Sequence, residues 1–490
     1  MKKLSIVLCA AAILSVILPS CEPARHTRHD GSAPKETDIA QAETEYSREN
    51  IPDNLPPLDF EGKTITIHSR GDDESMDEVY IETLTGNIVD DAIYNRNLKV
   101  EERLNVKIEV FAADGWERYY NSITQLKASI AAGDAAFDIV AGWSAAIPQV
   151  SIEGLLYNLV GIDYLDFNQP WWNQSCIDEL RIGGSLYFIT GDIAKSYLYA
   201  MQMYLFNKKL AQDNNIENLY GVVREFKWTI DYVNSIVKDM YRDLNGNSEV
   251  DSEDAFGLVT ASTNDADAYM QSFRVSMISR DENGMPVLDV DEERLASCVE
   301  KVYDLLWGNQ GCITDTDGVA QYEIFVSDRS LFTTARMIEL EITFNKMESD
   351  YGVLPYPMFD ETQKQYGTRV QDALSLWCIP VDIVQPEISA AVLEALAAQS
   401  YRTVTPAYYD VALKNRYSRD ADTAEMIDLI RSSAILNFEC IYNESIGNPW
   451  FVMRSLMSSQ NNNFASYWAA NSKVVETQLK KVVEEIQKIS

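Results

Sequence analysis

Histidine is the scarcest chemistry-bearing residue in this chain of 490 residues. There are three, and His26 and His29 fall in a polar stretch near the N-terminus, which leaves His68 for the folded part. A folded active site therefore has at most one imidazole to use as a base or a metal ligand. Ser-His-Asp catalysis, Cys-His catalysis and multi-histidine zinc sites are disfavoured. Carboxylate-only chemistry, as in glycosidases, needs two acids and stays open.

Basic residues are also few, with 41 Lys and Arg against 75 Asp and Glu and a formal net charge of −34. Nucleic acids and anionic membrane surfaces are bound through clustered cations. Neither is therefore expected as a partner. The acidic composition instead favours a neutral or polar ligand.

Cysteine pairs with metal-site spacing are lacking. Cys9 and Cys21 lie near the N-terminus, and the other five of the seven cysteines are widely spaced with no CxxC pair. Neither a disulfide scaffold nor a thiolate metal cage is indicated. Most of these five thiols are expected to be buried, while pairing of Cys298 with Cys312 is left open by the sequence.

Long apolar runs are limited to the N-terminus, where two lysines precede the apolar residues 4–18. This pattern predicts a secretory signal peptide over 1–20, and no later stretch has the length and apolarity of a membrane span. The run ends in Leu-Pro-Ser followed by Cys21, which resembles a bacterial lipobox and predicts a lipid anchor there. A plain secretory peptide with a chance cysteine is the alternative. Residues 21–55 are polar and predict a disordered tether.

The remaining chain is long enough for two domains, because single cores stop growing at roughly 250–300 residues. Strand patterns at 63–68, 106–111 and 137–141 alternate with helical patterns at 90–104 and 119–132. This order predicts an α/β fold with a mainly parallel sheet, in which ligands bind beyond the carboxyl ends of the strands. Trp143 follows the third strand there. Its ring suits stacking on a sugar, although a core position is an equally good interpretation.

Residues 243–254 have the oxygen spacing of an EF-hand calcium loop. Ser248 stands where such loops usually have Gly, and an Asp stands where the bidentate Glu is usual. A solvated acidic turn is the alternative. The pattern predicts a structural calcium ion, with Glu249 contributing its backbone carbonyl, and the ligands would be Asp243, Asn245, Asn247, Glu249, Asp251 and Asp254.

Segments spread over most of the mature chain resemble the carbohydrate-type extracellular solute-binding proteins of bacterial ABC transporters. They are the Phe-Asp-Ile-Val of 137–140, the Gly-Gly-Ser-Leu-Tyr of 183–187, residues 204–210, the Lys-Trp-Thr of 227–229, the loop of 243–258 and residues 351–357. The resemblance implies a two-lobed periplasmic-binding-protein-like fold with a hinge. The implied lobes are 56–190 with 325–373, and 191–324 with 374–490.

The resemblance also implies a binding role without a reaction. The expected activity is capture of a sugar or oligosaccharide by a monomeric, membrane-anchored lipoprotein and its delivery to an ABC transporter permease. An Arg replaces the usual aromatic near the end of 331–336, which leaves a neutral or an acidic ligand open. A cell-surface glycan-active enzyme with paired carboxylates and a sensing subunit are the alternatives. The implied ligand contacts are Arg70, Asp72, Trp143, Tyr197, Asp267, Tyr269 and Arg336.

Overall fold

The computed structural model describes residues 47–113, 118–216, 218–314, 319–418 and 420–489. The chain divides into two units, Met1–Ile51 and Pro52–Ser490. In the first unit, only residues 47–51 are described, with the short 3-10 helix η1 (Arg48–Asn50). The predicted signal peptide and Cys21 lie outside the described residues. Among the described helices, none has both the length and the apolar composition that spanning a membrane requires.

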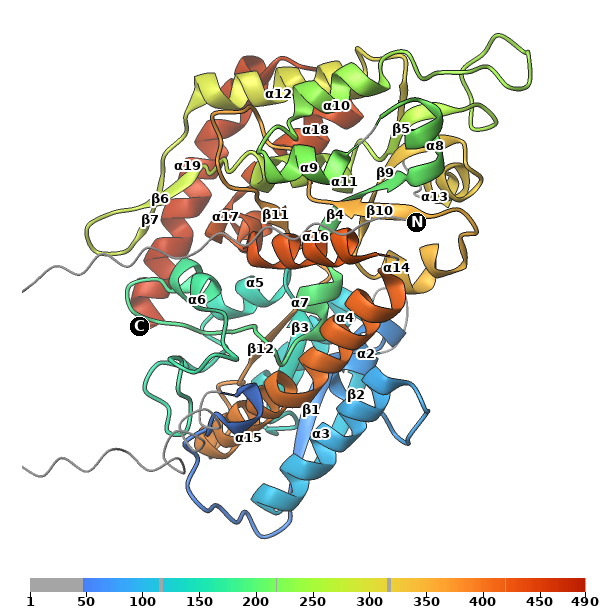
Figure 1. Ribbon diagram of the computed structural model, residues 1–490. Helices are drawn as coiled ribbons and strands as arrows, with labels where there is room; N and C mark the ends of the chain where they lie inside the picture. Colours follow the sequence, from blue (N-terminus) through green and yellow to red (C-terminus); the bar gives the residue numbers. More distant parts are fainter. Residues whose placement is uncertain (1–46, 114–117, 217, 315–318, 419, 490) are drawn as a thin grey trace, which may run out of the picture. The chain divides into compact units, whose positions relative to one another are not determined.

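The second unit contains a four-stranded sheet with the order β12-β3-β1-β2 (Figure 1). Its strands are β1 (Lys63–Arg70), β2 (Val106–Ala113), β3 (Ile139–Trp143) and β12 (Ser375–Cys378). β1 is parallel to both β2 and β3, and β12 is antiparallel to β3. The β-branched run that predicted the first strand supplies Ile65 and Ile67, both buried. We call this sheet and the helices packed on it the first lobe.

The helices of the first lobe connect and cover these strands. α3 (Ile88–Leu104) begins at Asn87, whose side chain accepts a hydrogen bond from the Val89 N–H, and it ends at Asn105 in the left-handed conformation. α4 (Arg118–Ala132) contacts β1, β2 and β3, and α15 (Pro386–Gln399) packs on α3. The others are α2 (Asp73–Val79), α5 (Ile147–Ile152), η3 (Ser400–Val404) and η4 (Pro406–Tyr417).

A five-stranded sheet has the order β10-β4-β9-β5-β8 and forms, with its helices, the second lobe. Its strands are β4 (Gln202–Asn207), β5 (Phe256–Thr260), β8 (Cys312–Thr314), β9 (Ser330–Arg336) and β10 (Tyr351–Leu354). β4 is buried along its whole length and pairs antiparallel with both β9 and β10. Tyr204 of β4 packs edge-on against Trp228 and Tyr356 in the core. Many of the abundant aromatic residues thus serve packing.

The remaining elements complete the second unit. They are α6 (Gln174–Leu180), α7 (Lys195–Tyr199), α8 (Lys208–Asp213), α9 (Leu219–Arg224), α10 (Ile230–Val237), α11 (Asn264–Ser272), β6 (Ile278–Arg280), β7 (Pro286–Leu288), α12 (Glu292–Leu306), α13 (Val319–Val326), α14 (Glu339–Ile342), η2 (Phe344–Lys346), β11 (Thr368–Arg369), α16 (Ala421–Ser432), β13 (Ala434–Ile435), α17 (Phe438–Ile441), η5 (Asn443–Ile446), η6 (Pro449–Phe451), α18 (Val452–Ser458) and α19 (Phe464–Ile489).

The lobe boundaries differ from the predicted ones. β9 and β10 were expected in the first lobe with 325–373, but both pair within the second sheet. β12, α15, η3 and η4 were expected in the second lobe with 374–490, but β12 pairs with β3 and the helices contact α3. Strand patterns reveal which segments are extended, whereas the partner of each strand depends on contacts distant in sequence. The chain passes between the sheets at 371–374.

The predicted tether also ends earlier than residue 55. Asp53 is 6% exposed, and its carboxylate pairs with Arg103 of α3 and with Arg402 of η3. Two guanidinium groups compensate the desolvation of this carboxylate, so polar composition alone misjudged the segment. Cys298 and Cys312, whose pairing the sequence left open, are both buried free thiols.

His68 is packed in the first lobe between the rings of Phe111 and Phe137. It is 1% exposed, and burial lowers the pKa of its imidazole from 6.5 to about 4. This ring therefore serves the core, and His68 offers no general base to a solvent-exposed site.

Replacement of His68 by Phe should remove part of the acid sensitivity of the fold. As the pH falls below 6.5, His68 becomes protonated in the unfolded chain. In the folded chain it is not protonated until the pH reaches about 4. Stability is therefore lost as pH falls through this window, by about 2 kcal/mol at pH 5. Urea unfolding of parent and His68→Phe at pH 7 and pH 5 measures the difference. Equal losses in the two proteins would contradict the assignment.

Candidate functional site

The carboxyl ends of β1 and β3 lie at the same edge of the first sheet, because the two strands are parallel neighbours. β1 ends at Arg70 and β3 at Trp143. The passing segment 371–374 is fastened to this edge. Ser144 donates from its N–H to the Leu374 carbonyl at 3.2 Å and from its Oγ to the Asp372 carbonyl at 2.9 Å. This edge therefore gathers residues from three distant parts of the chain.

Arg70 links the end of β1 to residues 373–375 at this edge. Its side chain is buried, and its Nη2 donates to the Ala373 carbonyl and to the Ser375 Oγ, each at 2.8 Å. Asp72 caps α2, accepting from the N–H and the hydroxyl of Ser75. In this arrangement, both residues hold backbone segments in place.

Trp143 lies beside a second aromatic residue, Tyr120 of α4. Their ring centroids are 5.8 Å apart and the ring planes are nearly perpendicular, at 86°. Tyr120 is 59% exposed and Trp143 is partly exposed. Two amphipathic rings are thus presented at the strand ends, where an apolar ligand face can stack on them.

Two carboxylates complete this group. Burial, followed by the negative charges of Glu444 and Asp372, raises the pKa of the Tyr120 phenol. Burial and the neighbouring Asp372 also raise the pKa of Glu444. The charges of both acids thus act on Tyr120, and the hydrogen bond from Ser144 holds the backbone of Asp372 at the residue after Trp143. We call Tyr120, Trp143, Asp372 and Glu444 the aromatic–acid cluster. It combines flat apolar faces with hydrogen-bond acceptors, the combination that recognises a polyhydroxylated ring.

The predicted contacts of the second lobe lie in its interior. Asp267 is fully buried between two arginines, at 3.5 Å from Arg369 and in a closer pair with Arg454. Tyr269 is also buried, and its hydroxyl is hydrogen-bonded to the hydroxyl of Tyr204. As the structure places them, both side chains contribute to the core of the second lobe.

The partners found for Tyr197 and Arg336 do not belong to the aromatic–acid cluster. The Tyr197 hydroxyl accepts from the Asn173 Nδ2 at 2.7 Å, and its ring lines a small cavity of about 190 Å³ with Trp172 and Arg431. Arg336 ends β9 and forms an ion pair with Glu339 at 3.4 Å. The Glu339 carboxylate thus offsets the positive charge of Arg336, the charge for which the sequence had left an acidic ligand possible.

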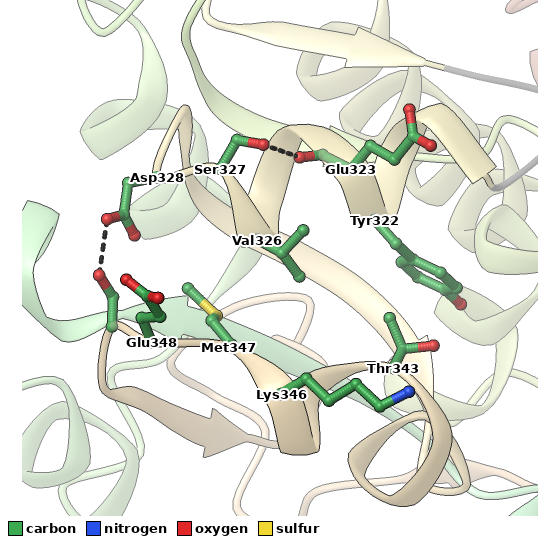
Figure 2. Close-up of a pocket in the computed structure, with 10 residues that line it drawn as sticks. Tyr322, Glu323, Val326, Ser327, Asp328, Thr343, Lys346, Met347 and Glu348 are labelled. Carbon is green, nitrogen blue, oxygen red and sulfur yellow. Dashed lines mark hydrogen bonds between the residues drawn. The ribbon is translucent and has the colours of Figure 1, made fainter.

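A cavity of about 610 Å³ lies between α13 and η2 in the second lobe. Figure 2 shows Tyr322, Val326 and Met347 around it, with Lys346 and Glu323 also lining it. Ser349 donates to Asp328 at one end. None of the residues predicted from the sequence as ligand contacts lines this cavity. No residue of the aromatic–acid cluster lines it either.

The oxygens of the predicted calcium loop accept hydrogen bonds from groups of the loop itself and from Tyr241. Asp243 accepts from the N–H groups of Gly246 and Ser248, and Asp254 accepts from the Leu244 N–H and the Tyr241 hydroxyl. Asp251 accepts from the side-chain amides of Asn245 and Asn247, and the backbone carbonyl of Glu249 accepts from Tyr241. Nowhere in the described chain are three His, Cys, Asp or Glu side chains placed so that they could hold a metal ion.

Calcium binding stays a prediction, and a melting experiment decides it. If the loop binds calcium, added calcium should raise the Tm and excess chelator should lower it, since a ligand specific for the folded state stabilises that state. Magnesium at equal ionic strength is the control. Superimposable melting curves with calcium and with chelator would favour the alternative of a solvated acidic turn.

The sequence pointed to Trp143 but missed Tyr120, Asp372 and Glu444. Tyr120 is an exposed aromatic in the first turns of a helix, a feature with no distinctive sequence signal. Asp372 comes from a connecting segment and Glu444 from η5, both far from Trp143 in sequence. Their approach depends on the crossing at 371–374 and on the placement of η5, neither of which follows from local patterns.

No family model matches the sequence, and no curated protein matches it. Two solved structures match over most of the chain. One is a cyclo/maltodextrin-binding protein complexed with maltotetraose, with a TM-score of 0.54 and 11% identity over 87% of this chain and 97% of that one. The other is an ABC substrate-binding protein from Listeria monocytogenes in complex with cycloalternan, with a TM-score of 0.53 and 13% identity over 87% and 98%. The chain therefore has the two-lobed α/β fold of these solute-binding proteins, as the resemblance implied.

Proposed function

We propose that this protein is an extracellular, lipid-anchored binding protein that captures a sugar or oligosaccharide and delivers it to an ABC transporter permease. The aromatic–acid cluster carries the proposal. Two structures of the same fold hold maltotetraose and cycloalternan, which are oligosaccharides. The cluster offers stacking faces and hydroxyl acceptors at the carboxyl ends of two parallel strands, where ligands of α/β folds bind.

The transport role would use movement of the two lobes. A ligand that contacts both lobes stabilises a closed arrangement by its higher affinity for it, and a membrane partner recognises the closed state. The anchor at Cys21 rests on the lipobox-like sequence. Replacement of Cys21 by Ser should release the protein from the membrane fraction, and retention there would contradict the anchor.

Replacement of Trp143 by Ala tests the cluster as the binding site. Loss of a stacking aromatic should weaken saccharide binding by about 1 to 3 kcal/mol, roughly five-fold to more than a hundred-fold in Kd. Isothermal titration of the folded variant with the best saccharide ligand measures this change. Phe111→Leu is a matched control, because Phe111 is an exposed aromatic of the same sheet outside the cluster. Unchanged affinity in Trp143→Ala would remove Trp143 from the site.

A glycan-active enzyme is the second candidate, because burial and the charge of Asp372 raise the pKa of Glu444, the direction of shift that a general acid needs. Retaining and inverting glycosidases use two carboxyl groups on either side of the scissile bond. Product analysis separates the two functions. A transport protein should return the saccharide intact, whereas cleavage that is lost in Glu444→Gln would identify an enzyme.

A further inference from the structure

We propose that a groove lined by α6, α9, α16, residues 364–366 and Arg274, which follows α11, is a second saccharide-binding site, distinct from the aromatic–acid cluster. Two adjoining cavities of about 660 and 700 Å³ are both lined by Phe226, Tyr366, Leu429 and Ser432, and together we call them the groove. Figure 1 shows α9 and α16, which contribute to it. Neither cavity includes a residue of the aromatic–acid cluster.

Two helices end at this groove with a bulky residue where glycine is usual. α9 closes with the N–H of Phe226 bonded to the Val223 carbonyl and that of Lys227 to the Val222 carbonyl. α11 closes in the same way at Arg274. This is the Schellman arrangement, whose left-handed position favours Gly, sometimes Asn. Phe226 and Arg274 adopt it with φ of 54° each. At both helix ends a large side chain therefore occupies a left-handed backbone position.

Both side chains meet at Tyr366. The ring of Phe226 stacks on that of Tyr366, with centroids 5.8 Å apart and planes inclined by 19°. Arg274 Nη1 donates to the Tyr366 carbonyl at 3.1 Å, and the Tyr366 hydroxyl donates to the Val223 carbonyl at 2.8 Å. Phe226 is partly exposed while Tyr366 is buried. The result is a fixed aromatic face backed by a second ring.

The polar groups around this face carry both signs of charge. Arg274 and Lys364 line the same cavity as Asp178 and Glu179 of α6, and Ser432 and Ser433 line it as well. An anionic ligand would need a surplus of cations. Donors and acceptors of both kinds around an aromatic face instead suit a neutral sugar chain, whose rings are apolar on one face and hydroxylated at the rim.

Isothermal titration of the full mature protein measures the stoichiometry and affinity of three tetrasaccharides. Maltotetraose and cellotetraose are neutral, and tetragalacturonate is anionic. At least one neutral probe should occupy two sites on the parent. Phe226→Leu keeps apolar volume but removes the flat face, so it should weaken one site at least about ten-fold, equivalent to 1.4 kcal/mol. Phe226→Tyr should retain it. Trp143→Ala should weaken the other site only.

Arg274→Gly has a matched control in Gln460→Gly. Gln460 ends α18 with the same hydrogen-bond pattern and a φ of 51°, but it does not line the groove. Glycine relieves the backbone in both variants, yet only Arg274→Gly should weaken binding in the groove.

Each contrary result has its own meaning. A single neutral-saccharide site that Phe226→Leu leaves unchanged overturns this inference and leaves the proposed function standing. Preference of the groove for tetragalacturonate overturns the neutral ligand class. A parent protein that binds no saccharide contradicts both the proposed function and the second site.

Discussion

Asp267→Ala is expected to lower the free energy of unfolding by about 3 to 5 kcal/mol, the range for removing one partner of a buried ion pair. Asp267 lies fully buried between Arg369 and Arg454, and the side chain of Arg369 is itself only 1% exposed. Without the carboxylate, the Arg369 charge stays in a low-dielectric interior with much less compensation.

Urea unfolding of the purified variant measures this loss. Asp213→Ala is the control, because Asp213 pairs with Lys209 at the surface and both side chains are more than half exposed. Such pairs contribute at most about 1 kcal/mol. If Asp267→Ala costs no more than Asp213→Ala, the buried triad does not stabilise the second lobe.

Glu394→Leu is expected to cost about 3 kcal/mol, because it leaves buried donors without an acceptor. The two oxygens of Glu394 accept from the indole N–H groups of Trp171 and Trp172 at 3.0 and 2.9 Å, and one also accepts from the Asp166 N–H. The Glu394 side chain thus fastens the 166–172 segment to α15. Both rings are buried, so the Trp pair serves packing.

Glu394→Gln gives the matching pH experiment. Burial raises the pKa of Glu394 from 4.5 to about 8. The folded state therefore keeps a proton that the unfolded chain loses, and this group makes stability fall as pH rises from 4.5 to 8. Glutamine does not titrate, so the Gln variant should lose that component of the slope. Identical pH slopes in parent and variant would contradict the raised pKa.

Local patterns predicted the elements well because each depends on neighbouring residues. The β-branched run at 63–68 is β1, and the helical spacing at 90–104 is most of α3. Burial of a polar side chain has no such local signature. Asp267 and Tyr269 were expected to contact ligand, yet the structure places both inside the second lobe. The sequence does not show whether an Asp such as Asp267 faces a ligand or is buried between two arginines.

The aromatic–acid cluster shows the other limit of sequence reasoning. Trp143 could be found because a strand pattern ends beside it. Asp372 could not, since its position depends on Ser144 holding the crossing segment to the first sheet. The bulky residues at the ends of α9 and α11 are equally hidden, because only the observed φ of 54° shows that Phe226 and Arg274 occupy glycine-type positions.

The measurement that tests the central claim most directly is equilibrium binding of the mature protein to neutral oligosaccharides, with chemical analysis of the ligand after release. The proposed function predicts saturable binding, loss of affinity in Trp143→Ala and recovery of the saccharide unchanged. A saccharide recovered as fragments would identify an enzyme, and the absence of saturable binding to any saccharide would contradict the account.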